Sequence, residues 1–314
     1  MTINIAYSCD QAYIHHTGIS ILSLLETNRD IPDISLFLIQ KDVKQESILL
    51  IQNLARQYNR RVRIVPFDEI CFDLNTSSFG RHVETIYAKL FFERIGDIDK
   101  ILYIDSDTII AGSLQELWDT DLGDNLFAGV NVKALCSVAM LGLERADPTI
   151  NDGVVIVNVK ELRHQRMLEK FKAHIEKYNG SPPLLSEGTI NSVCAGKIKV
   201  IHPKYNLMSG LIEFRGNKFA DVDSFYSDDE IRDAIRAPVV IHFLSAFYNR
   251  PWDLHCTHPM RNHYLYYKAH SVWKDVPLEN KKLNIRLRLI KILYDVFPHD
   301  ILDFIRAVKE RYKK

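Results

Sequence analysis

The sequence predicts an α/β fold in which a mainly parallel sheet carries helices on both faces. Strand and helix patterns alternate through the first 130 residues, an order typical of parallel strands joined by crossover helices. The chain has 314 residues, of which 46% are hydrophobic and 25% charged, so it can bury a large core. We expect one enlarged domain, or one domain with a tail.

Apolar runs and amphipathic segments set the expected order of elements. In the first half, strands are expected at 3–7, 34–39, 62–67 and 101–104, and helices at 18–26, 45–58 and 85–94. After residue 125 the pattern loosens, with strands expected at 126–130, 154–158, 198–201 and 239–242 and helices at 162–178 and from 186. The long connection between residues 130 and 154 is typical of a functional or mobile loop.

Two acids directly follow the expected strand at 101–104. Asp105 and Asp107 are separated by one residue, so in extended backbone their side chains point to the same side. Carboxylates that converge at the end of a buried strand favour a hard divalent cation such as Mg²⁺ or Mn²⁺. A pair of turn residues is the alternative. It suits the acid-x-acid triplets in polar surroundings better, and these lie at 97–99, 119–121 and 221–223.

Features that are absent from the sequence argue against several classes of function. The net formal charge is zero, which argues against nucleic acid as a partner. The chain contains neither GxGxxG nor GxxxxGKS/T, which weakens the dinucleotide-binding and ATP-hydrolysing interpretations. Five scattered cysteines without a CxxC pair favour a reducing cytoplasm. The start of the chain shows no signal peptide, and no apolar run is long enough to cross a bilayer.

Six short motifs follow one another along the chain. They are Tyr-Ala-Lys-Leu at 87–90, Leu-Tyr-Ile-Asp-Ser-Asp at 102–107, Leu-Trp-Asp at 117–119, Asn-Asp-Gly-Val at 151–154, His-Phe at 242–243 and Arg-Pro-Trp at 250–252. Together they resemble family 8 glycosyltransferases, the retaining enzymes related to bacterial lipooligosaccharide galactosyltransferases and to glycogenin. The resemblance runs from about residue 3 to residue 273, nearly nine-tenths of the chain. Cys-Thr-His-Pro at 256–259 and Trp273 are similar to a bacterial subgroup associated with surface polysaccharide synthesis.

The resemblance implies a GT-A fold, a single Rossmann-like nucleotide-diphospho-sugar domain over 1–275 with a mixed, mainly parallel sheet. It also implies that Asp105, Asp107 and His242 hold Mn²⁺ or Mg²⁺ between the two phosphates of a UDP-sugar. A cation there would stabilise the charge of the departing UDP. Without the resemblance, His242 would more simply be a strand-end histidine hydrogen-bonded to backbone.

The resemblance further implies a set of donor-binding residues, which are Ala6, Tyr7, Asp10, Lys89, Ser106, Asn131, Ser245 and Arg250. The first three would contact uracil and ribose, and Lys89 and Arg250 would approach the diphosphate. Lys89 is otherwise a helix-surface lysine, and Asn131 an Asx-turn residue. Ala12 departs from the family, since it replaces an asparagine common in the first loop. Two extra residues after His242 leave the register open at Ser245 and Arg250.

Glu187, Ser186, Asn151 and Asp152 are the catalytic candidates that the resemblance implies. Ser186 and Glu187 stand where the family has an Asp-Gln pair, whose glutamine lies beside the anomeric carbon. A glutamate there would stabilise an oxocarbenium ion or attack it as a nucleophile. The competing interpretation is that Ser186 caps a helix, that Glu187 decorates its first turn and that Asn151 forms an Asx turn.

The segment 276–314 is expected to be a separate, basic helical tail. Residues 281–314 contain ten Lys and Arg against four Asp and Glu, and apolar residues from Ile285 to Val296 fall on one helical face. A basic amphipathic helix is typical of a membrane-surface anchor, and packing on the domain is the alternative. We expect a cytoplasmic protein that is peripheral at the inner face of the membrane.

The predicted function is metal-dependent, retaining transfer of a hexose, glucose or galactose, from a UDP-sugar to a glycan acceptor. The acceptor would belong to cell-surface polysaccharide or lipopolysaccharide synthesis, and it would be lipid-linked if the tail binds membrane. The alternative is a catalytically idle scaffold that binds sugar nucleotides, an interpretation that Ala12, Ser186 and Glu187 suggest. A nucleotidyltransferase is a third class, but the chain lacks the glycine-rich basic loop it needs near the first strand.

Overall fold

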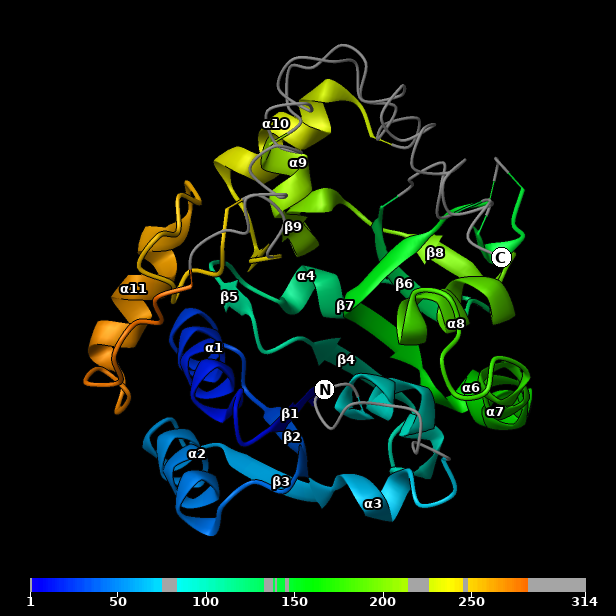
Figure 1. Ribbon diagram of the computed structural model, residues 1–314, viewed down its shortest axis with the longest axis horizontal. Coiled ribbons are helices and arrows are strands. Elements are labelled where there is room, and N and C mark those ends of the chain that lie inside the picture. The colour runs from blue at the N-terminus through cyan, green and yellow to red at the C-terminus, as the bar shows by residue number, and fades with distance from the viewer. Residues whose placement is uncertain are drawn as a thin grey trace.

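The computed structural model describes residues 2–74, 84–132, 138, 140–144, 147–213, 226–244 and 248–281. Seven strands form the central sheet in the order β3-β2-β1-β4-β7-β6-β8 (Figure 1). Strand β7 runs antiparallel to both of its neighbours, and the other four pairs are parallel. The bounds are β1 Ile3–Asp10, β2 Ile34–Lys41, β3 Arg61–Pro66, β4 Lys100–Ile104, β6 Phe127–Asn131, β7 Ile150–Asn158 and β8 Ile198–Val200. The predicted α/β class with a mixed, mainly parallel sheet is confirmed.

Helices cover both faces of this sheet, as Figure 1 shows. The helices that precede β8 are α1 Ile14–Thr27, α2 Gln45–Gln57, α3 Phe67–Ile70, η1 Glu84–Arg94 (a 3-10 helix), α4 Gln115–Trp118, α6 Val159–His164, α7 Met167–Lys177 and α8 Leu185–Val193. Those that follow it are η2 Pro203–Asn206 (also a 3-10 helix), α9 Ser209–Glu213, α10 Asp228–Arg236 and α11 Arg261–His270.

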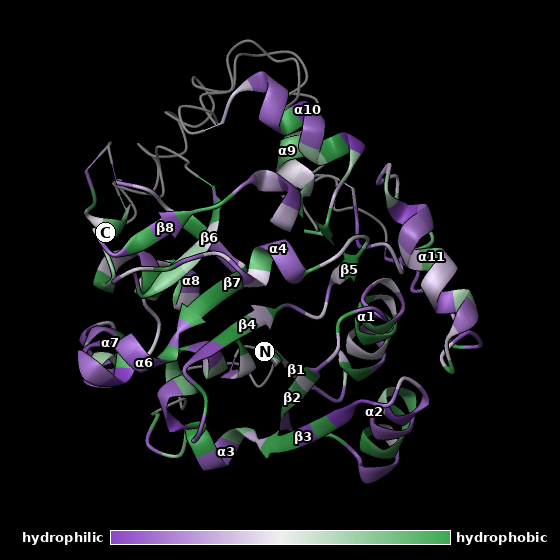
Figure 2. Ribbon diagram, turned by 180° about the vertical axis from the view of Figure 1, so that it is seen from behind, coloured by the Kyte–Doolittle hydropathy of each residue, from purple (hydrophilic) through white to green (hydrophobic). Residues whose placement is uncertain are grey.

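The sheet separates two apolar cores because successive strand residues point to opposite faces. Leu102 and Ile104 of β4 pack into the core beneath α1 and α2. Ile101 and Tyr103 pack into the other core, with side chains of η1 and α7. β7 is accordingly hydrophobic along most of its length, whereas much of α7 and α10 is hydrophilic (Figure 2). β4 is thus buried on both faces until it ends at Ile104.

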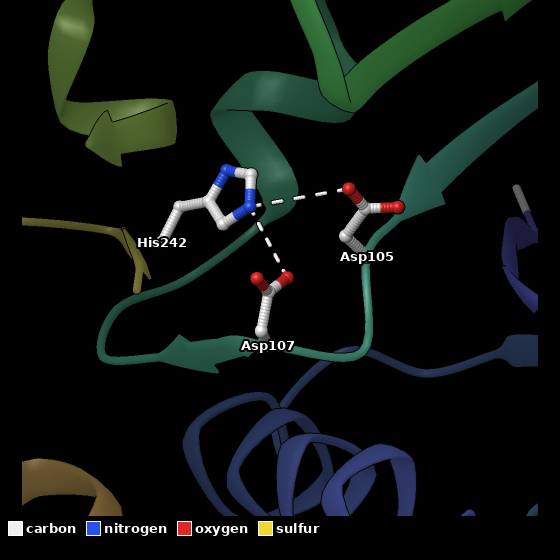
Figure 3. A group of neighbouring side chains, drawn as sticks. All are labelled: Asp105, Asp107 and His242. Atoms are coloured by element: carbon white, nitrogen blue, oxygen red, sulfur yellow. Dashed lines mark ion pairs between the residues drawn. The ribbon is translucent and has the colours of Figure 1, made fainter. Parts of the chain in front are cut away.

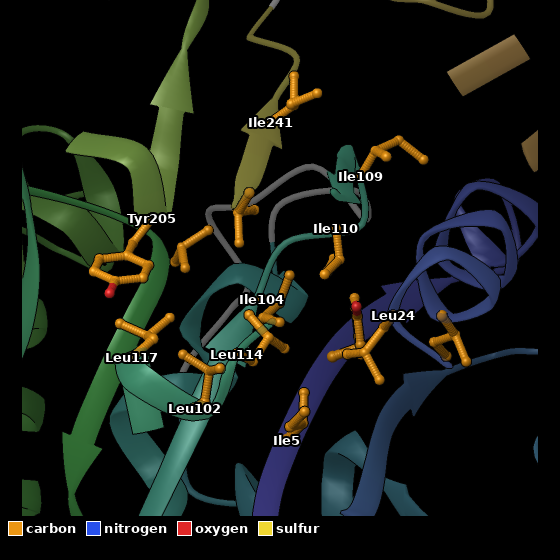
Figure 4. Close-up of a cluster of buried hydrophobic side chains, with 14 of the residues drawn as sticks. Ile5, Leu24, Leu102, Ile104, Ile109, Ile110, Leu114, Leu117, Tyr205 and Ile241 are labelled. Atoms are coloured by element: carbon orange, nitrogen blue, oxygen red, sulfur yellow. The ribbon is translucent and has the colours of Figure 1, made fainter. Parts of the chain in front are cut away.

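A second, three-stranded sheet packs against the first core. It has the order β5-β10-β9, with β5 Thr108–Ile110, β9 Leu207–Met208 and β10 Val240–His242. Ile109, Ile110 and Ile241 bring this sheet onto Leu24 of α1 and Leu102 of β4, all within one buried cluster (Figure 4). The small sheet therefore has a fixed position beside the end of β4.

Three regions differ from the elements that the sequence predicts. The helix expected at 162–178 is two helices, because Arg166 adopts a left-handed conformation (φ 53°) between α6 and α7. The Glu93 carboxylate accepts a hydrogen bond from the Leu168 N–H (2.7 Å), which fixes the start of α7. The expected helix at 85–94 is a 3-10 helix throughout. β5, β9 and the helices from α9 onward were not predicted, because most of them are short.

The C-terminal segment 248–281 packs against the sheet domain. A Cβ added to Gly18 of α1 would lie 2.0 Å from the indole of Trp273, so only glycine allows this contact. The Glu279 N–H donates to the Trp252 carbonyl oxygen (2.9 Å), and the Lys281 N–H donates to Asp253 Oδ2 (2.8 Å). The division into a domain at 1–275 and a tail at 276–314 stays a prediction, since residues 282–314 lie outside the described part of the chain.

Among the residues that the structure describes, no helix is both long and apolar enough to cross a membrane. The four described cysteines, at positions 9, 71, 194 and 256, are free and buried.

Candidate functional site

Three predicted metal ligands converge where β4 ends and the small sheet begins. Asp105 directly follows β4, and Asp107 directly precedes β5. β10 runs antiparallel to β5 and pairs His242 with Thr108, which places the imidazole beside both carboxylates. One ligand atom from each of the three side chains lies within 4.8 Å of the others. Figure 3 shows the three side chains pointing toward one another.

The donor set fits a divalent cation. His242 Nε2 lies 3.1 Å from Asp107 Oδ1 and 3.9 Å from Asp105 Oδ2. The imidazole faces both carboxylates from within the core, because the side chain is only 1% exposed. Two carboxylates and an imidazole nitrogen are ligands that Mn²⁺ and Mg²⁺ accept. A cation between them would replace the direct contact between Nε2 and the carboxylates.

Gly153 of β7 leaves room for this arrangement. A Cβ at this position would lie 2.4 Å from His242 Cε1 and 2.7 Å from Asp105 Oδ2. The Gly153 carbonyl oxygen also accepts a hydrogen bond from the Asp105 N–H (2.7 Å), so the backbone of β7 holds the first aspartate directly. Position 153 therefore requires glycine because neighbouring atoms lie so close to it, and not because of an unusual backbone conformation.

Charge balance around Asp107 keeps its buried carboxylate ionised. Burial alone would raise the pKa of Asp107, but the Arg250 guanidinium and His242 outweigh burial and hold this pKa well below its usual range. Burial alone would lower the pKa of His242, but Asp107 and Asp105 outweigh it and raise this pKa. Arg250 also donates to the Phe243 carbonyl oxygen (2.5 Å), so its place beside Asp107 is fixed.

Lys89 of η1 is a buried cation at the centre of the site. Its side chain is 1% exposed, which contradicts the alternative of a helix-surface lysine. The ammonium group lies 3.0 Å from Asp152 Oδ2 and 3.9 Å from Asp105 Oδ1, and 4.2 Å from the centre of the Tyr103 ring. The Tyr103 hydroxyl donates to Asp105 Oδ1 (2.7 Å). Lys89 thus joins the metal-ligand cluster to Asp152.

Helix α8 brings two catalytic candidates to β7. The Ser186 hydroxyl donates to Asp152 Oδ2 (2.5 Å), and Asn151 Nδ2 donates to Glu187 Oε2 (2.8 Å). Asn191 fixes the helix on the strand, because its side chain bonds both the N–H and the carbonyl oxygen of Ile150 (each 2.9 Å). A Cβ added at position 188 would lie 1.8 Å from the Pro183 carbonyl oxygen, so the helix begins with a close backbone approach.

The environment of Glu187 moves the pKa of its carboxyl group toward neutral pH. Burial, followed by the negative charge of Asp152, raises the pKa of Glu187 to about 7, against the opposing hydrogen bond from Asn151. The capping interpretation is wrong for Ser186, because Leu184 occupies the N-cap and the serine hydroxyl bonds Asp152 instead. Glu187 lies in the first turn of α8, but it contacts Asn151 and is not a purely solvated residue.

The profile described as glycosyl transferase family 8 matches residues 4–256. The chain belongs to this family. A lipopolysaccharide 1,2-glucosyltransferase of Escherichia coli is 25% identical over 283 residues, which cover 88% of this chain and 80% of the relative.

Two solved structures of the galactosyltransferase LgtC share the fold of this family 8 chain. The complex with donor and acceptor sugar analogs has a TM-score of 0.69 at 20% identity, and covers 91% of this chain and 99% of LgtC. An active-site glutamine-to-glutamate mutant has a TM-score of 0.72 at 21% identity with the same coverage. The predicted resemblance to family 8 and the GT-A fold are confirmed.

Several of the donor-binding residues predicted for this family 8 chain lie in β1 or just after β4. Ala6 and Tyr7 are fully buried within β1, where both pair with β2, and the Tyr7 hydroxyl lies 3.1 Å from Ser20 Oγ. Asp10 ends β1, and its Oδ1 accepts the Ala12 and Tyr13 N–H groups (3.0 and 3.1 Å). Ser106, between the two metal-ligand candidates, is buried against Thr17 (2.8 Å).

Two predicted donor-binding residues remain, Asn131 and Ser245. Asn131 ends β6, where its Oδ1 accepts the Thr149 N–H (3.0 Å) and its N–H donates to the Tyr226 hydroxyl (2.8 Å). Its buried Nδ2 has no hydrogen-bond partner among the described residues. Ser245 lies outside the described residues.

Two residues of the site were missed by the sequence interpretation. Tyr103 could have been found, because it precedes Asp105 by two positions and therefore points to the same side of the strand. Asn206 carries no such signal. It lies at the end of η2, outside the motifs, and reaches the site only because β9 pairs with β10.

Gly153→Ala is expected to weaken Mn²⁺ binding at least about tenfold, because the added methyl would displace His242 or Asp105. Titration with Mn²⁺, with free metal measured by electron paramagnetic resonance, would test this. Gly96→Ala is the matched control, since a Cβ there has no neighbour within 4 Å. Wild-type affinity in Gly153→Ala would show that the crowded atoms are not the ligands.

Proposed function

We propose that this family 8 chain catalyses metal-dependent transfer of a hexose, glucose or galactose, from a UDP-sugar to a glycan acceptor. The observation that carries the proposal is the convergence of Asp105, Asp107 and His242 Nε2 on one point at the end of β4, with His242 only 1% exposed. The name of the E. coli relative supports an acceptor in lipopolysaccharide or other surface-polysaccharide synthesis. We place the reaction in the cytoplasm, where nucleotide sugars are the usual donors.

Asp105, Asp107 and His242 would hold Mn²⁺ or Mg²⁺, which when bound neutralises the charge of the diphosphate leaving group. Arg250 is paired with Asp107 and 27% exposed, so it can also approach a phosphate. Lys89 would hold Asp105 and Asp152 in place, because it lies between their carboxylates. These positive groups supply electrostatic stabilisation at the position where negative charge develops.

Glu187, Asp152, Asn151 and Ser186 would act on the sugar side of the same site. Departure of UDP leaves positive charge on the anomeric carbon, and an ionised carboxylate stabilises that charge or attacks it. Glu187 fits this role, since Asn151 orients its carboxylate through a 2.8 Å hydrogen bond. Transfer with retention of anomeric configuration follows if the acceptor enters on the face from which UDP departs.

The basic segment 281–314 would hold the enzyme at the inner face of the membrane, where a lipid-linked acceptor is presented. This part of the proposal rests on sequence alone, with ten basic residues against four acidic ones and one apolar helical face. Residues 282–314 lie outside the described residues.

Asp105→Ala, Asp107→Ala and His242→Ala are each expected to lower metal-dependent transfer at least about 100-fold, because each removes a ligand atom. Turnover of UDP-glucose and UDP-galactose at saturating Mn²⁺, with and without acceptor, measures this loss. Asp119→Ala is the matched control, since Asp119 belongs to another acid-x-acid triplet and is exposed. Wild-type rates in any of the three variants would disprove the assignment. Failure of the wild type to turn over any UDP-sugar would favour a scaffold, and an inverted linkage by NMR would exclude retention.

Activity should depend on ionisation of Glu187. With a pKa of about 7, the carboxyl is protonated at lower pH, so kcat/KM should fall as the pH drops from 8 to 6. In Glu187→Gln this pH dependence should disappear, and kcat at pH 8 should be at least about tenfold lower. Glu176→Gln on the exposed face of α7 is the control and should keep the wild-type profile. An unchanged profile in Glu187→Gln would remove the carboxylate from the reaction.

Truncation after Lys281 should leave a folded enzyme with normal turnover of soluble acceptors. Lys281 must stay, because its carbonyl oxygen accepts a hydrogen bond from Asn249 Nδ2 (3.1 Å). Binding to vesicles that contain anionic lipid should fall sharply, and full-length binding should weaken with salt, since each basic side chain contributes about 1 kcal/mol before screening. Undiminished vesicle binding by a folded truncated protein would contradict the membrane role of the tail.

A further inference from the structure

A chain of buried polar side chains connects the candidate metal ligand His242 to Glu187. His242 Nδ1 lies 3.0 Å from Asn206 Oδ1, and Asn206 Nδ2 donates to Asn151 Oδ1 (2.9 Å). Asn151 Nδ2 in turn donates to Glu187 Oε2 (2.8 Å). Asn206 is fully buried, and His242 is 1% exposed. The two halves of the site are therefore joined through one asparagine that no motif contains.

The backbone of Gly153 determines the direction of every bond in this chain. Its N–H donates to Asn151 (3.1 Å), and a backbone N–H is always a donor, so the Asn151 atom facing it must be the amide oxygen. The Asn206 atom bonded to that same oxygen must then be the amide nitrogen. Asn206 consequently presents its oxygen to His242, whose Nδ1 must carry the proton.

From this polarity we infer that Asn206 is a positioning residue that holds His242 in the tautomer whose Nε2 lone pair faces Asp105 and Asp107, ready to bind the cation. The inference rests on the proposed metal site. A neutral imidazole carries one proton, so a proton held on Nδ1 leaves Nε2 as the ligand atom. With the opposite tautomer, an N–H would point at the cation position and the Asn206 oxygen would have no donor.

The same polarity orients Glu187. Because the Asn151 oxygen is occupied by Gly153 and Asn206, its amide nitrogen is left to donate to the Glu187 carboxylate. Asn206 is held in place because it directly precedes β9, which pairs with β10 at His242↔Met208. A change at Asn206 should consequently affect two properties that can be measured separately, metal affinity through His242 and turnover through Glu187.

Two substitutions separate these properties. Asn206→Leu has similar volume but no polar atoms, so it should weaken Mn²⁺ binding about 10- to 100-fold, measured by electron paramagnetic resonance without donor. Asn206→Asp keeps an acceptor for His242 Nδ1 but cannot donate to Asn151. It should bind Mn²⁺ within about threefold of wild type, yet lower kcat at saturating Mn²⁺ at least about tenfold. Asn206→Asp decides the inference by itself if Asn206→Leu does not fold.

Asn28→Leu and Asn28→Asp are matched controls, because Asn28 is equally buried and its side chain bonds Leu24 and Leu114 at the end of α1. They should lower thermal stability without changing Mn²⁺ affinity. Wild-type affinity in folded Asn206→Leu, or equal loss of affinity in Asn206→Asp, would overturn the inference, as would an unchanged kcat in Asn206→Asp. His242→Ala distinguishes the two levels: unchanged Mn²⁺ affinity there would disprove the proposed metal site itself.

Discussion

The antiparallel pairing of β5 with β10 is the constraint on which the site depends. Asp107 lies just before β5 and His242 ends β10, so the register that pairs His242 with Thr108 brings together side chains far apart in sequence. The register is held by apolar contacts, since Ile109, Ile110 and Ile241 are fully buried. A slip by one residue would turn these side chains out of the core and His242 away from the carboxylates.

Buried charge is the second constraint, and it explains why the site contains so many ionisable groups. Three carboxylates, Asp105, Asp107 and Asp152, lie beside two cations, Lys89 and Arg250, and beside the imidazole of His242. Removing one partner of a buried pair costs about 3–5 kcal/mol, because it leaves an uncompensated charge. Each of these buried charges therefore depends on its neighbours for compensation.

The metal-ligand cluster and the sugar-side residues form one polar network and not two adjacent sites. Lys89 joins them through Asp105 and Asp152, and Asn206 joins them through His242 and Asn151. β7 is common to both connections, since Asn151, Asp152 and Gly153 are consecutive on it. The two groups of residues are therefore positioned by the same strand.

The fold class and two of the metal-ligand candidates, Asp105 and Asp107, could be predicted from the sequence because they depend on local patterns. Apolar runs that alternate with amphipathic segments predicted the sheet and its helices, and the end of an apolar run at Asp105 marked the site. His242, Lys89 and Glu187 came from motif resemblance, which preserves position along a chain even when partners are distant. The alternative of an ordinary structural role could be tested only once the burial of each residue was known. Lys89, for example, is 1% exposed and is therefore not a surface lysine.

Only the tertiary structure decided which groups touch. The break at Arg166, the small sheet and the role of Asn206 depend on contacts between segments far apart in sequence, for which no local pattern exists. The direction of the hydrogen bonds from His242 to Glu187 follows from one backbone N–H, that of Gly153. The sequence by itself determined the chemical groups available to this protein. Packing determined their protonation, orientation and partners, because these depend on distance and burial.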